Sequence, residues 1–237
     1  MATERVALLG HPVAQSRSPR MQNAAFTAAG LDWTYTAIDV ELGGLLDAVR
    51  SLLQEGFKGA NVTAPHKVAA LGACDEVDER AERAESVNTL VFRDGRVLGT
   101  TTDTEALDEV DGTTALLLGG GGAARAWRAA LEARGIAVRQ FTRSGAWPPD
   151  AAGTDVIVNA TPVIGELLVE PGATHAVIDL PYRGDGGETA LVAAARAVGS
   201  RTIVDGLEVL ARQGAAAFER WTGVDAPLDV MRAAVRG

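Results

Sequence analysis

The chain has 237 residues, which is enough for one large domain or two modest ones. Lys and Arg number 22 and Asp and Glu number 31, so the net charge is −9. This balance argues against nucleic acid as a partner, because binding to phosphates requires a basic face. The lone Cys74 excludes an intrachain disulfide and fits a reducing cytoplasm. We expect no metal site from one cysteine and three scattered histidines, no membrane span and no signal peptide.

The first hundred residues predict a mixture of strands and helices. Ser18, followed by Pro19, is the expected N-cap of a first helix that ends near Gly30. Asp94-Gly95 is typical of a tight hairpin turn. We expect strands at Val6–Leu9, Thr34–Val40, Phe57–Thr63, Val87–Phe92 and Val97–Leu98, and further helices at Leu45–Leu53 and after Pro65.

The second half alternates strands and helices more regularly, which predicts a parallel sheet with right-handed crossovers. The expected strands are Ala115–Leu118, Ile136–Phe141, Val156–Val158, Ala176–Leu180 and Thr202–Val204, and the expected helices are Ala123–Arg134, Thr189–Val198, Leu207–Phe218 and Leu228–Val235. The short polar stretch 104–114 suggests a boundary. We therefore predict an α/β protein of two domains, residues 1–103 and residues 104–205, while the pattern leaves open where the helices of residues 206–237 pack.

The run Gly119–Gly122 lies between a buried strand and an Ala-rich helix. Aligned to the pattern G-x-G-x-x-A, its fixed positions are Gly119, Gly121 and Ala124. Glycines there let the backbone approach a pyrophosphate, which the free N–H groups of the helix N-terminus would bind. The sequence favours a dinucleotide site over an ordinary glycine turn.

The second strand of this half ends in Thr142-Arg143-Ser144, with no carboxylate. NAD sites usually carry Asp or Glu at this point, whereas Arg143 could face the 2′-phosphate of NADP and the two hydroxyls could assist. NADP is therefore the expected cofactor, with a solvated surface arginine as the alternative. No second basic residue follows Arg143, and residues 145–149 cannot sustain a helix.

Three groups of residues could carry chemistry. Lys67 is one of only two lysines in a chain that otherwise uses arginine, and a lysine can release its proton whereas arginine cannot. Asp103 lies just before the predicted domain boundary, where ligands often bind, although it could simply cap the next segment. Ser16 and Ser18 lie at a helix start that suits a carboxylate, although Ser18 could serve only as the cap.

Seven short motifs in order resemble the shikimate dehydrogenase family, and the likeness extends over nearly the whole chain. The motifs are Gly10-x-Pro12-x-x-x-Ser16-x-Ser18-Pro19, Asn61-Val62-Thr63-x-Pro65-x-Lys67, Val87-Asn88-Thr89, the glycine run 119–126, Asn159-Ala160-Thr161-Pro162, Asp179-x-x-Tyr182, and a C-terminal signature that includes Asp205-Gly206-Leu207, Gln213-Gly214 and Trp221-Thr222-Gly223. The resemblance implies an NADP-dependent, cytoplasmic oxidoreductase, monomeric or homodimeric. It would reversibly reduce 3-dehydroshikimate to shikimate in chorismate and aromatic amino-acid biosynthesis.

The resemblance also implies a role for each matching residue. It assigns catalysis to Lys67 and Asp103, substrate binding to Ser16, Ser18, Thr63, Asn88 and Gln213, and cofactor binding to Gly119, Gly120, Gly121, Gly122, Ala123, Ala124, Thr142, Arg143, Ser144, Asn159, Ala160, Thr161, Pro162, Tyr182 and Gly206. It further implies that the C-terminal helices, residues 206–237, complete the first domain.

The chain departs from the family pattern at several points. Thr101 stands where the family has Asn, and an extra residue precedes Gly165. The connection from Asp103 to Ala115 is short, so we expect the family's linking helix to be trimmed. Two alternatives stay open. One is a quinate or aminoshikimate dehydrogenase of the same family with relaxed cofactor choice. The other is a non-catalytic, regulatory dinucleotide-binding protein, which would have no need of Lys67 and Asp103 together.

Overall fold

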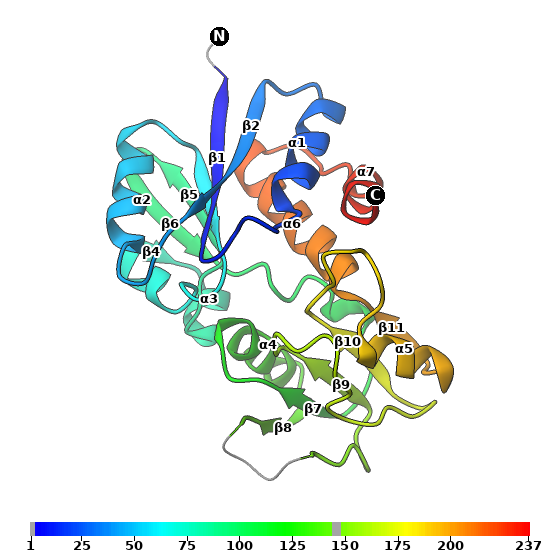
Figure 1. Ribbon diagram of the computed structural model, residues 1–237. Coiled ribbons are helices and arrows are strands. Elements are labelled where there is room, and N and C mark those ends of the chain that lie inside the picture. The colour runs from blue at the N-terminus through cyan, green and yellow to red at the C-terminus, as the bar shows by residue number, and fades with distance from the viewer. Residues whose placement is uncertain (1–2, 144–147) are drawn as a thin grey trace.

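The computed structural model describes residues 3–143 and 148–237. These residues form two α/β lobes, each built on its own sheet (Figure 1). The predicted two-domain α/β class is therefore confirmed.

The first sheet has six strands in the order β2-β1-β3-β5-β6-β4. Its strands are β1 (Glu4–Gly10), β2 (Trp33–Asp39), β3 (Gly59–Val62), β4 (Glu76–Val77), β5 (Thr89–Arg93) and β6 (Arg96–Thr100). β1 runs parallel to both of its neighbours, whereas β5 is antiparallel to β3 and β6. The predicted hairpin is confirmed: Asp94 and Gly95 have φ values of 53° and 73°, which a two-residue turn of this kind requires.

Two local predictions in this lobe are wrong. The helix expected after Pro65 is replaced by a 3-10 turn (Ala69–Ala73), β4 and the short helix α3 (Glu79–Ala84). The reason is that Asp75 accepts a hydrogen bond of 2.7 Å from the backbone N–H of Val97, which holds the chain against β6.

The first helix, α1 (Ser18–Ala28), has Arg17 and not Ser18 at its N-cap. Ser18 is already helical, and its backbone N–H donates to Ser16 Oγ at 3.2 Å.

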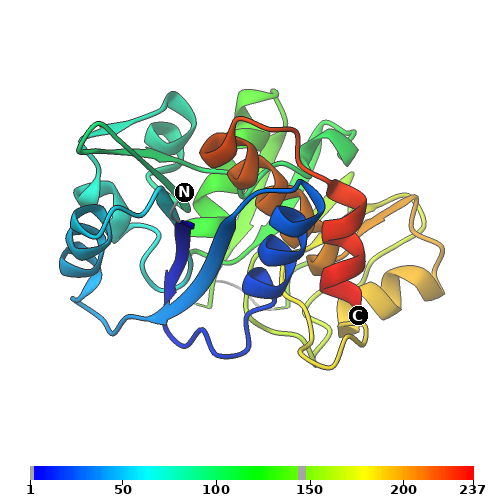
Figure 2. The ribbon, with the colours of Figure 1, turned by 90° about the horizontal axis from the view of Figure 1, so that it is seen from above.

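The last two helices, α6 (Gly206–Thr222) and α7 (Leu228–Arg236), pack against α1 beside the first sheet (Figure 2). The Phe26 ring stacks on Phe218 with centroids 5.2 Å apart. Trp221 Nε1 donates to the backbone carbonyl of Leu90 in β5 at 2.9 Å. Helix α2 (Leu45–Gln54) packs on the core cluster that also includes Leu90. The chain therefore returns to the first lobe after completing the second.

The second sheet has five parallel strands in the order β11-β10-β9-β7-β8. Its elements are β7 (Thr114–Leu118), α4 (Gly122–Ala133), β8 (Ala137–Phe141), β9 (Val156–Asn159), β10 (Ala176–Asp179), α5 (Ala190–Ala197) and β11 (Thr202–Val204). The central strands are buried on both faces, as expected of a parallel sheet covered by helices. The predicted alternation of strands and helices is confirmed.

The connection between the lobes contains only a 3-10 turn, Leu107–Glu109, in place of a linking helix. Arginines of both lobes hold this turn. Arg212 of α6 pairs with Glu109 at 2.6 Å, and Arg134, which follows α4, donates to the carbonyl of Leu107 at 2.8 Å. The short connection is thus tied to each lobe.

Candidate active site

A cavity of about 1250 Å³ lies between the lobes, at the C-terminal ends of β3 in the first sheet and of β7, β9 and β10 in the second. It brings together most of the residues selected from the sequence. Those that line it are Ser16, Ser18, Thr63, Lys67, Asn88, Asp103, Gly119, Gly120, Gly121, Gly122, Ala123, Thr142, Arg143, Ala160, Thr161, Pro162, Tyr182, Gly206 and Gln213.

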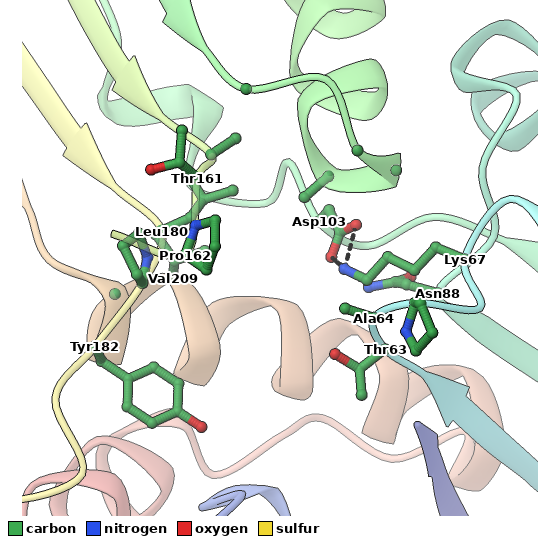
Figure 3. Close-up of a pocket in the computed structure, with 18 of the residues that line it drawn as sticks. Thr63, Ala64, Lys67, Asn88, Asp103, Thr161, Pro162, Leu180, Tyr182 and Val209 are labelled. Atoms are coloured by element: carbon green, nitrogen blue, oxygen red, sulfur yellow. Dashed lines mark hydrogen bonds and ion pairs between the residues drawn. The ribbon is translucent and has the colours of Figure 1, made fainter. Parts of the chain in front are cut away.

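Lys67 and Asp103 form an ion pair on one side of the cavity (Figure 3). Lys67 Nζ lies 2.7 Å from both carboxylate oxygens of Asp103. The two side chains are 16% and 8% exposed, so little water competes for the pair. Lys67 follows β3, and its carbonyl accepts a 2.9 Å hydrogen bond from the N–H of Val87. The lysine is therefore fixed at both its backbone and its ammonium group.

Asn88 forms a hydrogen bond with the carboxylate of this pair. Its Nδ2 donates to Asp103 Oδ1 at 2.8 Å and lies 3.4 Å from Gln213 Oε1. Its Oδ1 accepts from the backbone N–H of Thr102 at 2.8 Å. Because a backbone N–H can only donate, this contact fixes the orientation of the amide, with the nitrogen toward Asp103. Thr102 is a residue of the site that sequence reasoning missed.

A second layer of polar side chains supports Asn88. Asn61 Nδ2 donates to Thr89 Oγ1 at 3.0 Å, and Tyr35 donates its hydroxyl to Asn61 Oδ1 at 2.8 Å. Burial raises the pKa of Tyr35, so its hydroxyl stays protonated and able to donate. This layer depends on the register of β3 and β5, which no single-sequence pattern specifies.

The second lobe presents backbone groups to the cavity. Gly119 has a φ of +118°, and a Cβ there would lie 2.9 Å from the carbonyl oxygen of Ala160, so only glycine fits. Gly121 caps α4 without a side-chain hydrogen bond. The first N–H groups of a 12-residue helix therefore remain available for an anion at the cavity. This cradle fits the pyrophosphate of a dinucleotide.

Arg143 follows β8, is exposed and lines the same cavity. The two described residues after β8, Thr142 and Arg143, include no carboxylate. Ser144, the third residue of the predicted phosphate motif, lies outside the described residues. Glu166 also lines the cavity and was missed, because nothing distinguishes it in the sequence from a surface glutamate.

Two of the predicted cofactor residues, Ala124 and Asn159, do not line the cavity. Ala124 is fully buried in α4, where a small residue lets the helix pack closely on the sheet. Asn159, at the end of β9, is 2% exposed. Its Oδ1 accepts from the N–H of Thr161 at 3.0 Å, and its Nδ2 donates to Asp179 at 2.7 Å. Asn159 thus shapes the loop that carries Thr161 and Pro162 into the cavity.

Asp179 is fully buried behind this loop. It also accepts a short hydrogen bond from Thr189, the N-cap of α5. Burial raises the pKa of Asp179 to about 6, although the hydrogen bonds from Thr189 and Asn159 act in the opposite direction. In Figure 3, Thr161, Pro162 and Tyr182 lie across the cavity from Lys67.

These features define a class of protein. A parallel sheet with a glycine turn at a helix N-terminus faces a second lobe that carries a paired lysine and carboxylate, as in two-domain dinucleotide-dependent dehydrogenases. In the described part of the chain, no cluster of three His, Cys, Asp or Glu side chains could hold a metal ion. The helices described here are all too short or too polar to cross a membrane.

The chain belongs to the shikimate dehydrogenase family. The shikimate dehydrogenase substrate binding domain matches residues 8–90, and the shikimate 5'-dehydrogenase C-terminal domain matches residues 206–236. A shikimate dehydrogenase (NADP(+)) of Anaeromyxobacter dehalogenans is 41% identical, with 98% of this chain and 97% of that protein aligned. One of Gluconobacter oxydans is 38% identical over 96% of this chain and 93% of that protein. The crystal structure of the Thermus thermophilus enzyme in complex with NADP(H) and shikimate has a TM-score of 0.88 and 34% identity, covering 98% of each chain.

Proposed function

We propose that this protein catalyses the NADP-dependent, reversible reduction of 3-dehydroshikimate to shikimate in aromatic amino-acid biosynthesis. The observation that carries this proposal is the Lys67–Asp103 pair, 2.7 Å apart, on the same cavity as the uncapped glycine turn. A hydride donor and a proton donor can meet in such a cavity. Family membership and the relatives named for this activity support the same conclusion.

Lys67 is the proposed proton donor and acceptor. NADPH, when bound, supplies the hydride. As the ketone carbon is reduced, negative charge develops on its oxygen, and the Lys67 ammonium stabilises that oxygen and protonates it. Asp103 holds the ammonium in place and accepts a hydrogen bond from the same hydroxyl. In the reverse direction, neutral Lys67 takes the proton of the alcohol.

The remaining side chains of the first lobe bind and orient the substrate. Ser16 and Ser18, at the start of α1, suit the substrate carboxylate because two hydroxyls beside a helix N-terminus favour an anion. Thr63, Asn88 and Gln213 line the cavity beside the ion pair and suit the ring hydroxyls. The amide of Asn88 is already oriented, and its two N–H groups face Asp103 Oδ1 and Thr102 Oγ1, so a ring hydroxyl would share or replace one of these contacts.

The second lobe holds NADP in this proposal. The pyrophosphate would lie at Gly119–Ala123, and Arg143 would bind the 2′-phosphate with Thr142 and Ser144 beside it. Ala160, Thr161, Pro162, Tyr182 and Gly206 would line the nicotinamide side. Ala124 and Asn159 are buried and would support the cofactor site indirectly. Ala124 would let α4 pack closely on the sheet, and Asn159 would fix the shape of the loop that carries Thr161.

We also propose the domain organisation that the sequence predicts: residues 1–103 and 206–237 as the substrate domain and residues 104–205 as the nucleotide domain. The packing of α7 on α1 supports it. A cytoplasmic location, and a monomer or homodimer as the assembly, remain predictions from the sequence.

Quinate dehydrogenase activity is the second candidate. Arg143 is the only basic residue of the nucleotide side that the described structure places on the cavity, which weakens discrimination against NAD. A quinate dehydrogenase of Corynebacterium glutamicum in complex with NAD has a similar structure, with a TM-score of 0.83 and 27% identity over 98% of each chain.

The deciding experiment follows absorbance at 340 nm with shikimate and quinate, each paired with NADP and with NAD. We expect strong reduction only with shikimate and NADP. Comparable rates with quinate or NAD would favour the second candidate. No turnover in any pairing, by folded protein that still binds NADP in calorimetry, would overturn both and favour a non-catalytic dinucleotide-binding protein.

A further inference from the structure

The dinucleotide pattern leaves two residues of the glycine turn unexplained, Gly120 and Gly122. A Cβ on Gly120 would lie 3.3 Å from Thr142 Cγ2, the end of a side chain, so the tighter limit is at Gly122. The pattern G-x-G-x-x-A fixes Gly119, Gly121 and Ala124, and Gly122 falls at a position where a side chain is allowed. Gly122 is the first residue of α4, and its φ lies outside the left-handed region. Neither the cofactor pattern nor the backbone conformation requires glycine here.

The first lobe supplies the missing reason. A Cβ on Gly122 would lie 2.7 Å from Lys67 Cβ and 2.7 Å from Ser86 Oγ. Both distances are far below van der Waals contact. Lys67 Cβ is bonded directly to the backbone, so it cannot rotate away as the end of a flexible side chain could. The added methyl group could therefore be accommodated only if the main chain at Lys67 or at Gly122 moved.

The two atoms that meet Gly122 belong to one rigid surface. The N–H of Val87, the residue after Ser86, donates to the carbonyl of Lys67 at 2.9 Å. Ser86 is fully buried, and its Oγ has no hydrogen-bond partner among the described residues. Next to it, Glu85 pairs with Arg125 of α4 at 2.5 Å. The start of α4 therefore packs directly against Lys67 and against residues 85–87.

We propose that Gly122 is a positioning residue, which sets the separation between the nucleotide-binding end of α4 and Lys67. This inference rests on the proposed function. With any larger residue at position 122, the distance between the two lobes would increase, while the NADP site and the substrate site would each keep all their residues. Displacements of about 1 Å between reacting groups can cost on the order of 100-fold in rate. The expected defect is therefore in turnover and not in NADP affinity.

The test compares Gly122→Ala with Gly121→Ala. A Cβ at Gly121 would meet no protein atom within 4 Å, and φ there is −80°, which alanine adopts readily. We expect Gly122→Ala to lower kcat at least tenfold. The Kd of NADP, measured by calorimetry without substrate, should stay within threefold of wild type, because alanine keeps the backbone N–H that Gly122 would offer the pyrophosphate and its Cβ would meet Lys67 and Ser86. We expect Gly121→Ala to show the opposite split, with the Kd of NADP raised at least tenfold because its methyl group obstructs the approach of the pyrophosphate to the backbone.

The inference is overturned if Gly122→Ala keeps kcat within twofold of wild type, or if its NADP affinity falls as far as its kcat. Ser86→Val approaches the same contact from the other lobe and is expected to reproduce the loss of kcat with NADP affinity retained. Thermal unfolding checks both variants, and Ser86→Val decides if Gly122→Ala does not fold. Wild-type protein without turnover would refute the proposed function. Active wild type with an unaffected Gly122→Ala would refute this inference alone.

Discussion

The two sides of the cavity are built differently. The lysine side consists of Lys67, Asn88, Asp103 and the polar residues that support them. Its side chains form hydrogen bonds with one another: Lys67 contacts both carboxylate oxygens of Asp103, and Asn88 contacts one of them. On the nucleotide side, the glycine turn at the start of α4 offers backbone N–H groups without a side-chain cap. The charged groups of the lysine side are therefore paired with each other within the protein, whereas the N–H groups of the nucleotide side are free to bind an anion.

This difference separates two kinds of requirement. The lysine side depends on particular side chains, and removal of one leaves a buried partner unsatisfied. The glycine turn of the nucleotide side depends on the absence of side chains, because Gly119 and Gly122 are each limited by a close contact. Substitutions on the lysine side should therefore reduce chemistry most, and those on the nucleotide side should alter affinity or separation.

The largest expected effect follows from Lys67→Ala. Positioned acid–base groups contribute about 100- to 10,000-fold in rate, so we expect kcat to fall by about 1000-fold. Substrate binding should be largely retained, because Ser16, Ser18, Thr63 and Gln213 still line the cavity. The measurement is kcat from absorbance at 340 nm, with shikimate affinity from calorimetry.

Lys58→Ala is the matched control. Lys58 is the chain's other lysine, and it pairs with Glu4 at 3.3 Å on the surface, away from the cavity. Its kcat should stay within twofold of wild type. Near wild-type turnover in Lys67→Ala would remove the lysine from the mechanism.

The next effect concerns Asp179, a buried carboxylate behind the loop that carries Thr161 and Pro162. Burial raises the pKa of Asp179 to about 6, above the value of about 3.9 in an unfolded chain. Between these values the folded state binds more protons, so the free energy of unfolding falls as the pH rises from about 4 to about 6. A shift of about two units corresponds to about 3 kcal/mol.

Asp179→Asn should remove this dependence of the free energy of unfolding on pH. Relative to wild type, the variant should therefore become more stable as the pH rises from about 4 to about 6. Urea unfolding at pH 4, 5, 6 and 7 measures it. Asp47→Asn, at a carboxylate that is 88% exposed on α2, is the control and should keep the wild-type slope. Parallel curves for Asp179→Asn and wild type would show that Asp179 does not titrate here.

The same difference explains how much could be predicted from the sequence. The glycine turn, the alternating strands and Lys67 were recognisable because each depends on a local pattern or on a rare residue type. The fixed amide of Asn88 could not be predicted, since it needs the N–H of Thr102 on the neighbouring strand end. The contact of Gly122 with Lys67 joins residues 55 positions apart in different lobes and leaves no local signal.

Arg143→Ala should affect cofactor selectivity by a smaller amount. Hydrogen bonds to charged groups contribute about 1.5 to 3 kcal/mol, so we expect kcat/KM for NADP to fall about 30-fold. The value for NAD should change less than threefold, because NAD lacks the 2′-phosphate. Initial rates with both cofactors measure the ratio. Arg50→Ala, an exposed position on α2, controls for loss of a positive charge, and an equal loss for NADP and NAD in Arg143→Ala would contradict the assignment.

The smallest expected effect concerns Thr101, which precedes Thr102 and Asp103 in the sequence. Thr101 is 2% exposed, yet its hydroxyl has no hydrogen-bond partner among the residues that the structure describes. Burial of an unpaired hydroxyl costs about 1–3 kcal/mol, so Thr101→Val should raise the free energy of unfolding by about 1 kcal/mol. The adjacent Thr100 is also buried, but its hydroxyl donates to Asp78, so Thr100→Val should lower stability by about as much. Urea unfolding of the pair should give opposite signs. A loss of stability in Thr101→Val would mean that the hydroxyl of Thr101 forms a hydrogen bond in the folded protein.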